Sequence, residues 1–431
     1  MKKALKIFIS ILLAIPFFYF CFLNVTIYYS PEFTNRKGQE INQDLLNQLR
    51  FLKQEIHGEA GDKMQEIYPE GFFFMHMLYG LTWCELAKSL KPGTLWYREA
   101  NLETAWAFSQ VNSQKGRSIF DPSLDLPYGA FYLGWSTYQF GKMIEFHPAG
   151  KRSEEDLRVF EFFCDRIAEH VLKSENPYPE SYSGQAWPSD ITVGMAALAL
   201  HDSFLEKKYG DAIASWISKV KTHLDSSGMI PHRVDPVSGE TLEEARGSSQ
   251  SLILNFLFEI DPVFARQQFS LYKKHFLDTR FGLPGIREYR HGSTGFGDVD
   301  SGPVILGIGG SASVVGLRTM ALFGEYEIAE GLRNSIEAFG MGYSRGHKKK
   351  YLFGAIPVAD AFIAWANSTE IDEKHVIKTN GNWQYKFHLW SILFIAPVVL
   401  LFLRTWRLKP KPWKKKNISG TFNPSAPGNT P

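Results

Sequence analysis

Four stretches of the chain combine carboxylates with aromatic residues or arginine directly before an apolar segment. They are residues 121–135 (DPSLDLPYGAFYLGW), 178–190 (YPESYSGQAWPSD), 232–250 (HRVDPVSGETLEEARGSSQ) and 287–303 (REYRHGSTGFGDVDSGP). Such groups fit general acid–base chemistry, in which one buried carboxyl with a raised pKa donates a proton and a second, ionised carboxylate acts as base or nucleophile. Hydrolysis of a sugar linkage needs two such carboxyls, one on either side of the scissile bond.

The predicted acid–base pair is Asp190 with either Asp298 or Asp300, and Glu244 is predicted as a third catalytic carboxylate. Asp190 and Asp300 are also placed to cap the helices expected after them, which is the structural alternative for both. The alternative for Glu244 and the glutamate before it is that one of them forms an ordinary ion pair with Arg246.

Substrate binding is assigned to aromatic and polar side chains of the same stretches. Aromatic faces stack on sugar rings or line an apolar pocket, and a guanidinium holds an anionic group through paired hydrogen bonds. The structural alternative for His232 is an ordinary loop histidine. The predicted binding residues are Tyr128, Trp135, Tyr182, Trp187, His232, Arg246, Gln250, Arg287 and Tyr289.

Other short motifs point to structure rather than to cofactor chemistry. The sequence contains no HExxH or paired CxxC motif, so no metal site and no cofactor are predicted. Gly307, Gly309 and Ala312 have the spacing of a dinucleotide-binding loop, but they fall inside a helical pattern without a βαβ unit and are predicted to permit tight helix packing. Cys84 and Cys164 are expected to be buried free thiols, and three cysteines exclude a disulfide scaffold.

Helical periodicity dominates the segments that must position these residues. Twelve helices are predicted, and no convincing series of strands, so the domain is expected to be mostly α. The predicted helices are residues 39–57, 72–89, 95–111, 128–143, 153–172, 191–207, 209–224, 247–259, 262–276, 302–323, 325–339 and 356–368.

Loop lengths group these helices into pairs. In the second half of the domain very short links alternate with long ones, and short links make antiparallel helical hairpins. The first member of each pair is apolar all round, as a helix buried on every side should be, whereas the second is amphipathic. About six such hairpins predict an (α/α)6 toroid, with an inner ring of buried helices and the long links gathered at one end of it.

Two apolar segments flank this domain. Residues 4–23 and 387–403 are predicted to span a membrane, the first as an uncleaved signal anchor. The formal net charge is only +2, but seven Lys and Arg lie within residues 404–416 and Lys2, Lys3 and Lys6 lie at the other end. Because positive residues stay on the cytoplasmic side, both termini are predicted to be cytoplasmic.

The resulting organisation has four parts. Residues 1–30 form a signal-anchor helix, 31–384 an extracytoplasmic, periplasmic domain, 385–403 a C-terminal transmembrane helix and 404–431 a basic, disordered tail. The expected partners are the lipid bilayer and a small-molecule or glycan substrate. The absence of an overall basic excess argues against nucleic-acid binding.

Three runs of residues resemble a known family. They are YPESYSGQAWPSDITVGMAALALHD, IPHRVDPVSGETLEEARGSSQSLIL and FGDVDSGPVILGIGGSAS, within residues 120–340. Together they resemble α/α-toroid proteins of the linalool dehydratase-isomerase-like type, neighbours of the six-hairpin glycosidases. The resemblance implies a site at the wide end of the inner helices and acid–base chemistry on an alcohol. It also implies a cysteine in the site, and the four stretches contain none.

The leading hypothesis is a membrane-anchored toroid enzyme, a hydrolase or lyase, that uses carboxylates on a carbohydrate or polyol-like substrate. A dehydratase or isomerase for an apolar alcohol is the second hypothesis. The third is a non-catalytic protein that binds a glycan or assists envelope assembly. Two carboxyls facing each other within about 5–10 Å would favour the first hypothesis.

Overall fold

The computed structural model describes residues 2–35, 40–299, 301–369 and 382–406. These residues form two compact units: Phe22–Ser391, and a smaller one that pairs Met1–Cys21 with the chain after Ile392. The larger unit contains all of the residues predicted to act on a substrate. The predicted residue Asp300 and the basic tail after residue 406 lie outside the described residues.

Six apolar helices form a closed inner ring in the larger unit. Each packs against the next, and the last packs against the first, which closes the ring. Nearly every residue of the first of these helices is buried, as expected for a helix surrounded on all sides. The inner helices are α4 (Gly71–Lys88), α6 (Gly129–Glu145), α8 (Pro188–Phe204), α10 (Gly247–Ile260), α12 (Gly310–Leu322) and α14 (Pro357–Asn367).

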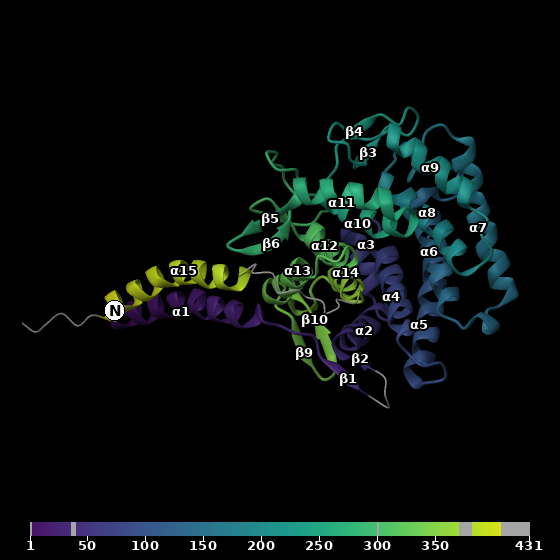
Figure 1. The fold of residues 1–431 in the computed structure, drawn as a ribbon. Helices are drawn as coiled ribbons and strands as arrows, with labels where there is room; N and C mark the ends of the chain where they lie inside the picture. The colour runs from purple at the N-terminus through teal and green to yellow at the C-terminus, as the bar shows by residue number, and fades with distance from the viewer. Residues whose placement is uncertain (1, 36–39, 300, 370–381, 407–431) are drawn as a thin grey trace, which may run out of the picture. The chain divides into compact units, whose positions relative to one another are not determined.

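Six further helices form an outer layer around this ring. Figure 1 shows α7 and α9 outside α6 and α8. Five outer helices follow their inner partners directly along the chain, but the sixth is α2, which packs on α14 from the other end of the sequence. The outer helices are α2 (Gln43–Ile56), α5 (Leu95–Val111), α7 (Glu154–Lys173), α9 (Gly210–Thr222), α11 (Pro262–Phe276) and α13 (Tyr326–Phe339).

The contacts therefore confirm the predicted α/α toroid and its division into buried inner and amphipathic outer helices. The centre of the ring is filled by aromatic side chains rather than open. Trp135 of α6 packs edge-on against Phe256 of α10, with ring centroids 5.3 Å apart, and Phe256 stacks on Trp365 of α14 at 6.2 Å. Cys84 and Cys164 are buried free thiols, as predicted.

Short elements modify the predicted helix pattern. Helix α3 (Ala60–Ile67) was not predicted, and short 3-10 helices cover Ala149–Lys151 and Leu352–Gly354. The long links contain antiparallel two-stranded hairpins. Their strands are β1 (Phe33–Asn35) with β2 (Glu40–Asn42), β3 (Arg233–Val234) with β4 (Thr241–Glu243), β5 (Leu277–Arg280) with β6 (Leu283–Ile286), β7 (Val304–Ile305) with β8 (Ile308–Gly309), and β9 (Tyr343–Arg345) with β10 (Lys348–Lys350).

The prediction of a helix over 302–323 is wrong in its first eight residues, which form the β7–β8 hairpin before α12 starts at Gly310. Gly307 lies in the turn of this hairpin at φ +83°, a conformation that glycine adopts without strain. Its role is thus a turn, not the tight helix packing predicted. No described helix starts at residue 302, so the structural alternative for Asp300, which lies outside the described residues, loses the helix that it required.

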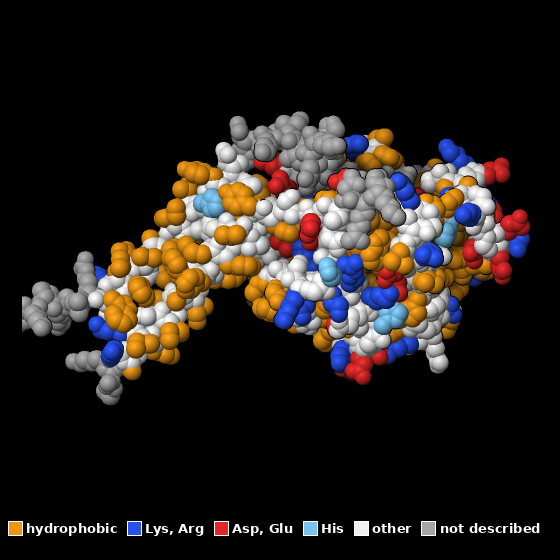
Figure 2. All heavy atoms as spheres, turned by 90° about the horizontal axis from the view of Figure 1, so that it is seen from below, with side chains coloured by type: hydrophobic (Ala, Val, Ile, Leu, Met, Phe, Trp, Pro, Cys, Tyr) orange, Lys and Arg blue, Asp and Glu red, His pale blue; other side chains and the backbone are white. Residues whose placement is uncertain are grey.

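The smaller unit contains most of two long apolar helices, α1 (Lys2–Thr26) and α15 (Trp383–Trp406). Both are long and apolar enough to cross a membrane, with mean hydropathies of 2.2 and 2.0. Within this unit the Phe20 and Phe394 rings stack at 5.6 Å, and Trp406 Nε1 donates to Ser10 Oγ at 2.7 Å. Apolar side chains cover the surface of these helices (Figure 2), which is the composition that a bilayer requires.

Candidate active site

The four stretches selected from the sequence meet at one end of the inner ring. Each precedes an inner helix, so the N-terminal ends of α6, α8, α10 and α12 are brought to the same end. Backbone hydrogen bonds join the stretches in chain order: Ala130 N donates to Glu180 O (2.9 Å), Val234 N to Ala186 O (3.1 Å) and Gly247 N to Glu288 O (2.8 Å).

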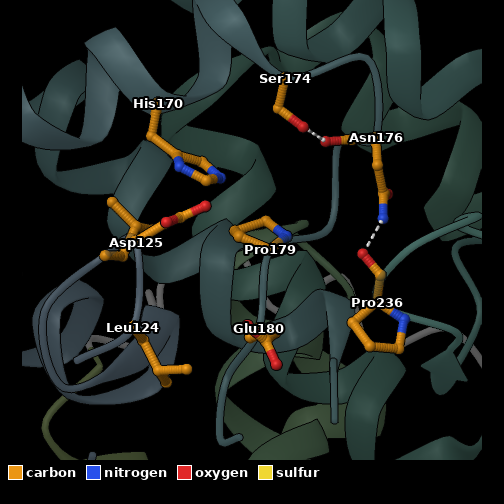
Figure 3. Close-up of a pocket in the computed structure, with 9 residues that line it drawn as sticks. Leu124, Asp125, His170, Ser174, Asn176, Pro179, Glu180 and Pro236 are labelled. Atoms are coloured by element: carbon orange, nitrogen blue, oxygen red, sulfur yellow. Dashed lines mark hydrogen bonds between the residues drawn. The ribbon is translucent and has the colours of Figure 1, made fainter. Parts of the chain in front are cut away.

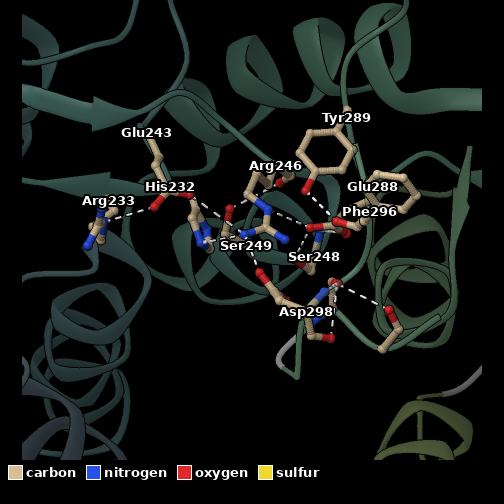
Figure 4. Close-up of polar contacts among 12 residues, drawn as sticks. His232, Arg233, Glu243, Arg246, Ser248, Ser249, Glu288, Tyr289, Phe296 and Asp298 are labelled. Carbon is tan, nitrogen blue, oxygen red and sulfur yellow. Dashed lines mark hydrogen bonds and ion pairs between the residues drawn. The ribbon is translucent and has the colours of Figure 1, made fainter. Parts of the chain in front are cut away.

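Arg246 is the centre of the polar cluster at this end (Figure 4). It is the N-cap residue of α10 and is only 7% exposed. Its Nε donates to Glu288 Oε1 at 2.9 Å, and its Nη1 donates to Asp298 Oδ2 at 2.7 Å. One guanidinium therefore holds two carboxylates of the link between α11 and α12, and one of them, Glu288, is fully buried.

The environments of these two carboxylates differ. Burial raises the pKa of Glu288, although Arg246 and the Ser248 hydroxyl and backbone N–H oppose that rise. Burial also acts to raise the pKa of Asp298, but hydrogen bonds from Arg246 and Ser301 outweigh it and lower that pKa to about 2. Asp298 is ionised at neutral pH, and its side chain is 46% exposed. Of the two, Asp298 is thus the one that can act as a base at neutral pH.

His232 is a further neighbour of Arg246 in this cluster. Burial, followed by the positive charge of Arg246, lowers the pKa of His232 to about 3, so the imidazole is neutral at neutral pH. Its Nε2 is 3.3 Å from Arg246 Nη1. Because a guanidinium can only donate, Nε2 must accept, and the proton of the neutral ring is therefore assigned to Nδ1.

Two donors of this cluster have no hydrogen-bond partner within the described part of the chain: His232 Nδ1 and Arg246 Nη2. Buried polar groups are nearly always paired with protein or water. These two donors are therefore left for groups that the described residues do not supply.

A short loop holds Asp298 in place. Its Oδ1 accepts from Ser301 N at 2.8 Å, and its own N–H donates to Ser301 Oγ at 2.9 Å. Tyr289, from the same link, lies beneath the guanidinium of Arg246 at 5.3 Å and donates from its hydroxyl to Phe296 O at 2.8 Å. The loop therefore positions the carboxylate without a helix or strand.

The adjacent glutamates point to different partners. Glu243 pairs with Arg233 at 2.9 Å and lies 3.7 Å from Arg246. Glu244 instead accepts from Ser226 and Arg290. The structure thus places Glu243 at the cluster, and Glu244, the predicted third carboxylate, is held apart from it.

Asp190 lies in the first turn of α8 and is 5% exposed. The residue at the N-cap is Trp187, so the structural alternative that Asp190 caps this helix is wrong: the helix starts at Pro188, three residues before the predicted start, because proline fits the first helical position. Trp187 packs edge-on against Tyr182 at 5.6 Å, and Tyr182 donates to Glu70 Oε1 at 2.7 Å. These residues form a second polar and aromatic group on the neighbouring link.

Four further predicted binding residues have partners within the protein. Trp135 is fully buried in the aromatic centre of the ring. Gln250 is buried on α10 and donates to Ile230 O at 2.6 Å. Arg287 is bound by Asp278 and by the carbonyls of Tyr289 and Ser293. Tyr128 is the residue before α6 and has a φ of +69°. The guanidinium of Arg117 lies over its ring, with Cζ 5.4 Å from the ring centroid.

Glu288 was missed by sequence reasoning. It is fully buried and follows directly after Arg287, which was selected as an anion-binding residue. The sequence signal that could have identified it is an acidic residue next to an arginine, directly after the short strand β6. Its partner, Arg246, is 42 residues away, and only the tertiary structure pairs them.

A separate cavity of about 120 Å³ lies between the first and second stretches and the end of α7 (Figure 3). His170 and Asp125 face one another across it, and Glu180 lies on its wall. Asn176 bridges this wall to the next link by donating to Pro236 O at 2.8 Å. Among the described residues, no group of three or more His, Cys, Asp or Glu has the arrangement of a metal site.

Comparison with known proteins gave matches to solved structures alone. No protein-family model matches the chain, and no curated protein matches it. A D-mannose isomerase is 12% identical, with a TM-score of 0.46 over 74% of this chain and 97% of its own. An unsaturated glucuronyl hydrolase specific for heparin is 11% identical, with a TM-score of 0.42 over 81% and 93% of the two chains.

A GH76 alpha-mannanase of Bacteroides thetaiotaomicron is also similar. It is 9% identical, with a TM-score of 0.42 over 75% of this chain and 87% of its own. The assignment of the toroid fold rests on the ring of helix contacts described above.

Proposed function

We propose that the protein is a membrane-anchored toroid enzyme that uses carboxylates for general acid–base chemistry on a carbohydrate or polyol-like substrate. The observation that supports this is Asp298, a half-exposed carboxylate that Arg246 holds in place and whose pKa is lowered to about 2. Helices α1 and α15 are proposed to span the membrane, with both termini cytoplasmic and the toroid outside.

In this proposal Asp298 is the base or nucleophile. It is the ionised and accessible member of the pair, since its side chain is 46% exposed. Arg246 holds Asp298 ionised and orients it. Glu288, which is fully buried, acts as a positioning residue that fixes Arg246 through Nε.

A proton donor is still required. Asp190 remains our candidate, because it lies in the first turn of α8, and Ala186 of the link before this helix is hydrogen-bonded to Val234 of β3, two residues from His232. The donors of His232 and Arg246 that have no partner among the described residues suit a substrate rich in hydroxyl groups, since a hydroxyl oxygen can accept from them and a hydroxyl can donate to Asp298. This combination is our reason for preferring a saccharide or polyol to an apolar alcohol.

The test is a screen of the full-length protein in detergent against oligosaccharides, polyols and terpene alcohols, followed by substitution of Asp298. We expect Asp298→Asn to lower kcat/KM at least about 100-fold, because it removes the ionised base. Asp235→Asn is the matched control, since Asp235 starts a similar loop turn, accepts from the backbone N–H of Ser238 three residues on and is partly exposed.

The proposal fails if Asp298→Asn retains the activity of the control. A protein that binds an oligosaccharide without converting it would instead support the non-catalytic hypothesis. The topology is tested separately by reporters fused to Pro431, and a reporter that is active outside the cytoplasm would overturn it.

A further inference from the structure

The two apolar helices leave the toroid at one place. Tyr28, which follows α1, donates to or accepts from His388 Nε2 of α15 at 2.6 Å, and the two rings stack at 5.6 Å. Asn334 of α13 donates to Ile27 O at 3.0 Å, which fixes the end of α1 to the domain. All of these residues belong to the larger unit.

Three hairpin turns surround this place. The Phe281 ring of the β5–β6 turn lies 5.6 Å from Trp390 of α15. Arg280 next to it donates to Leu306 O of the β7–β8 turn at 2.9 Å. On the other side, Lys349 of β10 donates to the hydroxyl of Tyr29 at 2.7 Å. Contacts therefore connect every one of these turns to the point where the helices leave.

The exposed residues of these turns are apolar on one hairpin and basic on another. Ile305 and Leu306 are 67% and 59% exposed at the tip of β7–β8. Arg345, His347 and Lys348 are exposed at the tip of β9–β10. An exposed apolar tip is costly in water and marks a contact surface, whereas basic side chains suit the phosphates of lipid headgroups.

We propose that this exit rim, composed of Phe281, Ile305, Leu306, Arg345 and Lys348, docks on the surface of the bilayer. Ile305 and Leu306 insert at the level of the headgroups, and the two cations lie at the lipid phosphates. A lipid surface is the favoured occupant because the rim is contiguous with the helices proposed to span the membrane, on which this inference rests.

Docking has a consequence for the candidate active site. The loop that holds Asp298 runs directly into β7 and carries Phe296 and Val299, which are 96% and 63% exposed. A docked rim would therefore hold the end of this loop that joins β7 close to the membrane surface.

The experiment uses the full chain in nanodiscs, with a spin label on single cysteines. Cys21→Ser removes the exposed thiol, and Cys84 and Cys164 are buried. Labels are placed through Leu306→Cys on the rim, Leu393→Cys within α15 and Val237→Cys on the β3–β4 turn. Val237 is the matched control, an apolar turn residue that is 87% exposed.

We expect the label at position 306 to be roughly tenfold less accessible to a water-soluble nickel complex than the label at 237, and more accessible to oxygen, which partitions into lipid. Equal accessibility at 306 and 237, with the label at 393 shielded, would overturn docking and leave the spanning helices intact. A label at 393 that is accessible to nickel would overturn both the spanning helices and the docking.

Discussion

At the residue scale, the candidate site depends on one arginine whose bonds were not visible in the sequence. Arg246 was predicted to orient a substrate, but its Nε and Nη1 are used to hold Glu288 and Asp298. The charge of the guanidinium is therefore largely neutralised within the protein. What it provides is a fixed, ionised Asp298 and the nitrogen Nη2, which has no partner among the described residues.

The buried carboxyl of Asp360, in the first turn of α14, allows a prediction about stability. It is 3% exposed, its Oδ1 accepts from Tyr351 N at 2.8 Å, and its Oδ2 has no partner among the described residues. Burial raises its pKa to about 7. The folded state therefore binds a proton that the unfolded chain releases near pH 4, so ionisation of Asp360 destabilises the fold as the pH rises from about 4 to about 7.

We expect Asp360→Asn to stabilise the protein by at most about 4 kcal/mol at pH 8 and by only about 1.6 kcal/mol at pH 5, where the folded wild-type side chain is still protonated but the unfolded one is ionised. The side-chain carbonyl of asparagine can still accept from Tyr351. Thermal unfolding of both proteins at the two pH values measures the difference. An equal gap at pH 5 and pH 8 would contradict the assignment.

At the element scale, glycine permits the close approach of the links to the inner helices. A Cβ at Gly247, the first residue of α10, would lie 1.8 Å from Arg287 O, and Gly247 N donates to Glu288 O at 2.8 Å. The same glycine therefore sets the distance between Arg246 and Glu288. A larger residue at this position must push the link between α11 and α12 away from α10.

We expect Gly247→Ala to destabilise the protein by more than about 3 kcal/mol or to prevent folding, because backbone cannot move aside as a side chain can. The matched control is Gly210→Ala, at the first residue of α9, where a Cβ would meet no atom within 4 Å. That substitution should be neutral or stabilising by up to about 1 kcal/mol. Denaturation in detergent compares the two, and similar losses would refute the steric explanation.

At the scale of the whole molecule, the ring has no covalent closure, so contacts between distant segments must close it. Arg318 of α12 does this at the C-terminal ends of the inner helices. It lies 3.3 Å from Glu85 of α4 and donates to Thr369 Oγ1, just after α14, at 2.6 Å. Burial raises the pKa of Glu85, but Arg318, Lys142 and Lys88 outweigh it and lower that pKa to about 2.

We expect Arg318→Ala to destabilise the protein by about 3–5 kcal/mol at pH 7, because it leaves a buried carboxylate without its main cation. The stability contributed by Glu85 is present above its unfolded pKa of about 4.5 and is lost as the pH falls towards 2, so the loss in Arg318→Ala should be smaller at pH 3. Lys208→Ala, which removes an exposed ion pair with Glu161, is the control and should cost less than about 1 kcal/mol. A loss that is the same at pH 3 and pH 7 would exclude this role for Glu85.

The sequence by itself determined the helices, their pairing and their buried or amphipathic character. These follow from periodicity and loop length, which are local properties, and they predicted the toroid. The β7–β8 hairpin was missed because its strands have two residues each, too few for a periodic signal.

Only the tertiary structure decided which polar residues act together. Arg246 meets Asp298 across 52 positions, and α2 joins α14 to complete the outer layer across the whole domain. Neither pairing can be recognised from a local pattern in the sequence, because it depends on how segments that are distant in the sequence pack together. The same packing buried Glu288, separated Glu244 from the cluster and placed Trp135 in the core. The chain thus encodes its helices locally, and its candidate active site arises from the packing of the long links against one another and on α10.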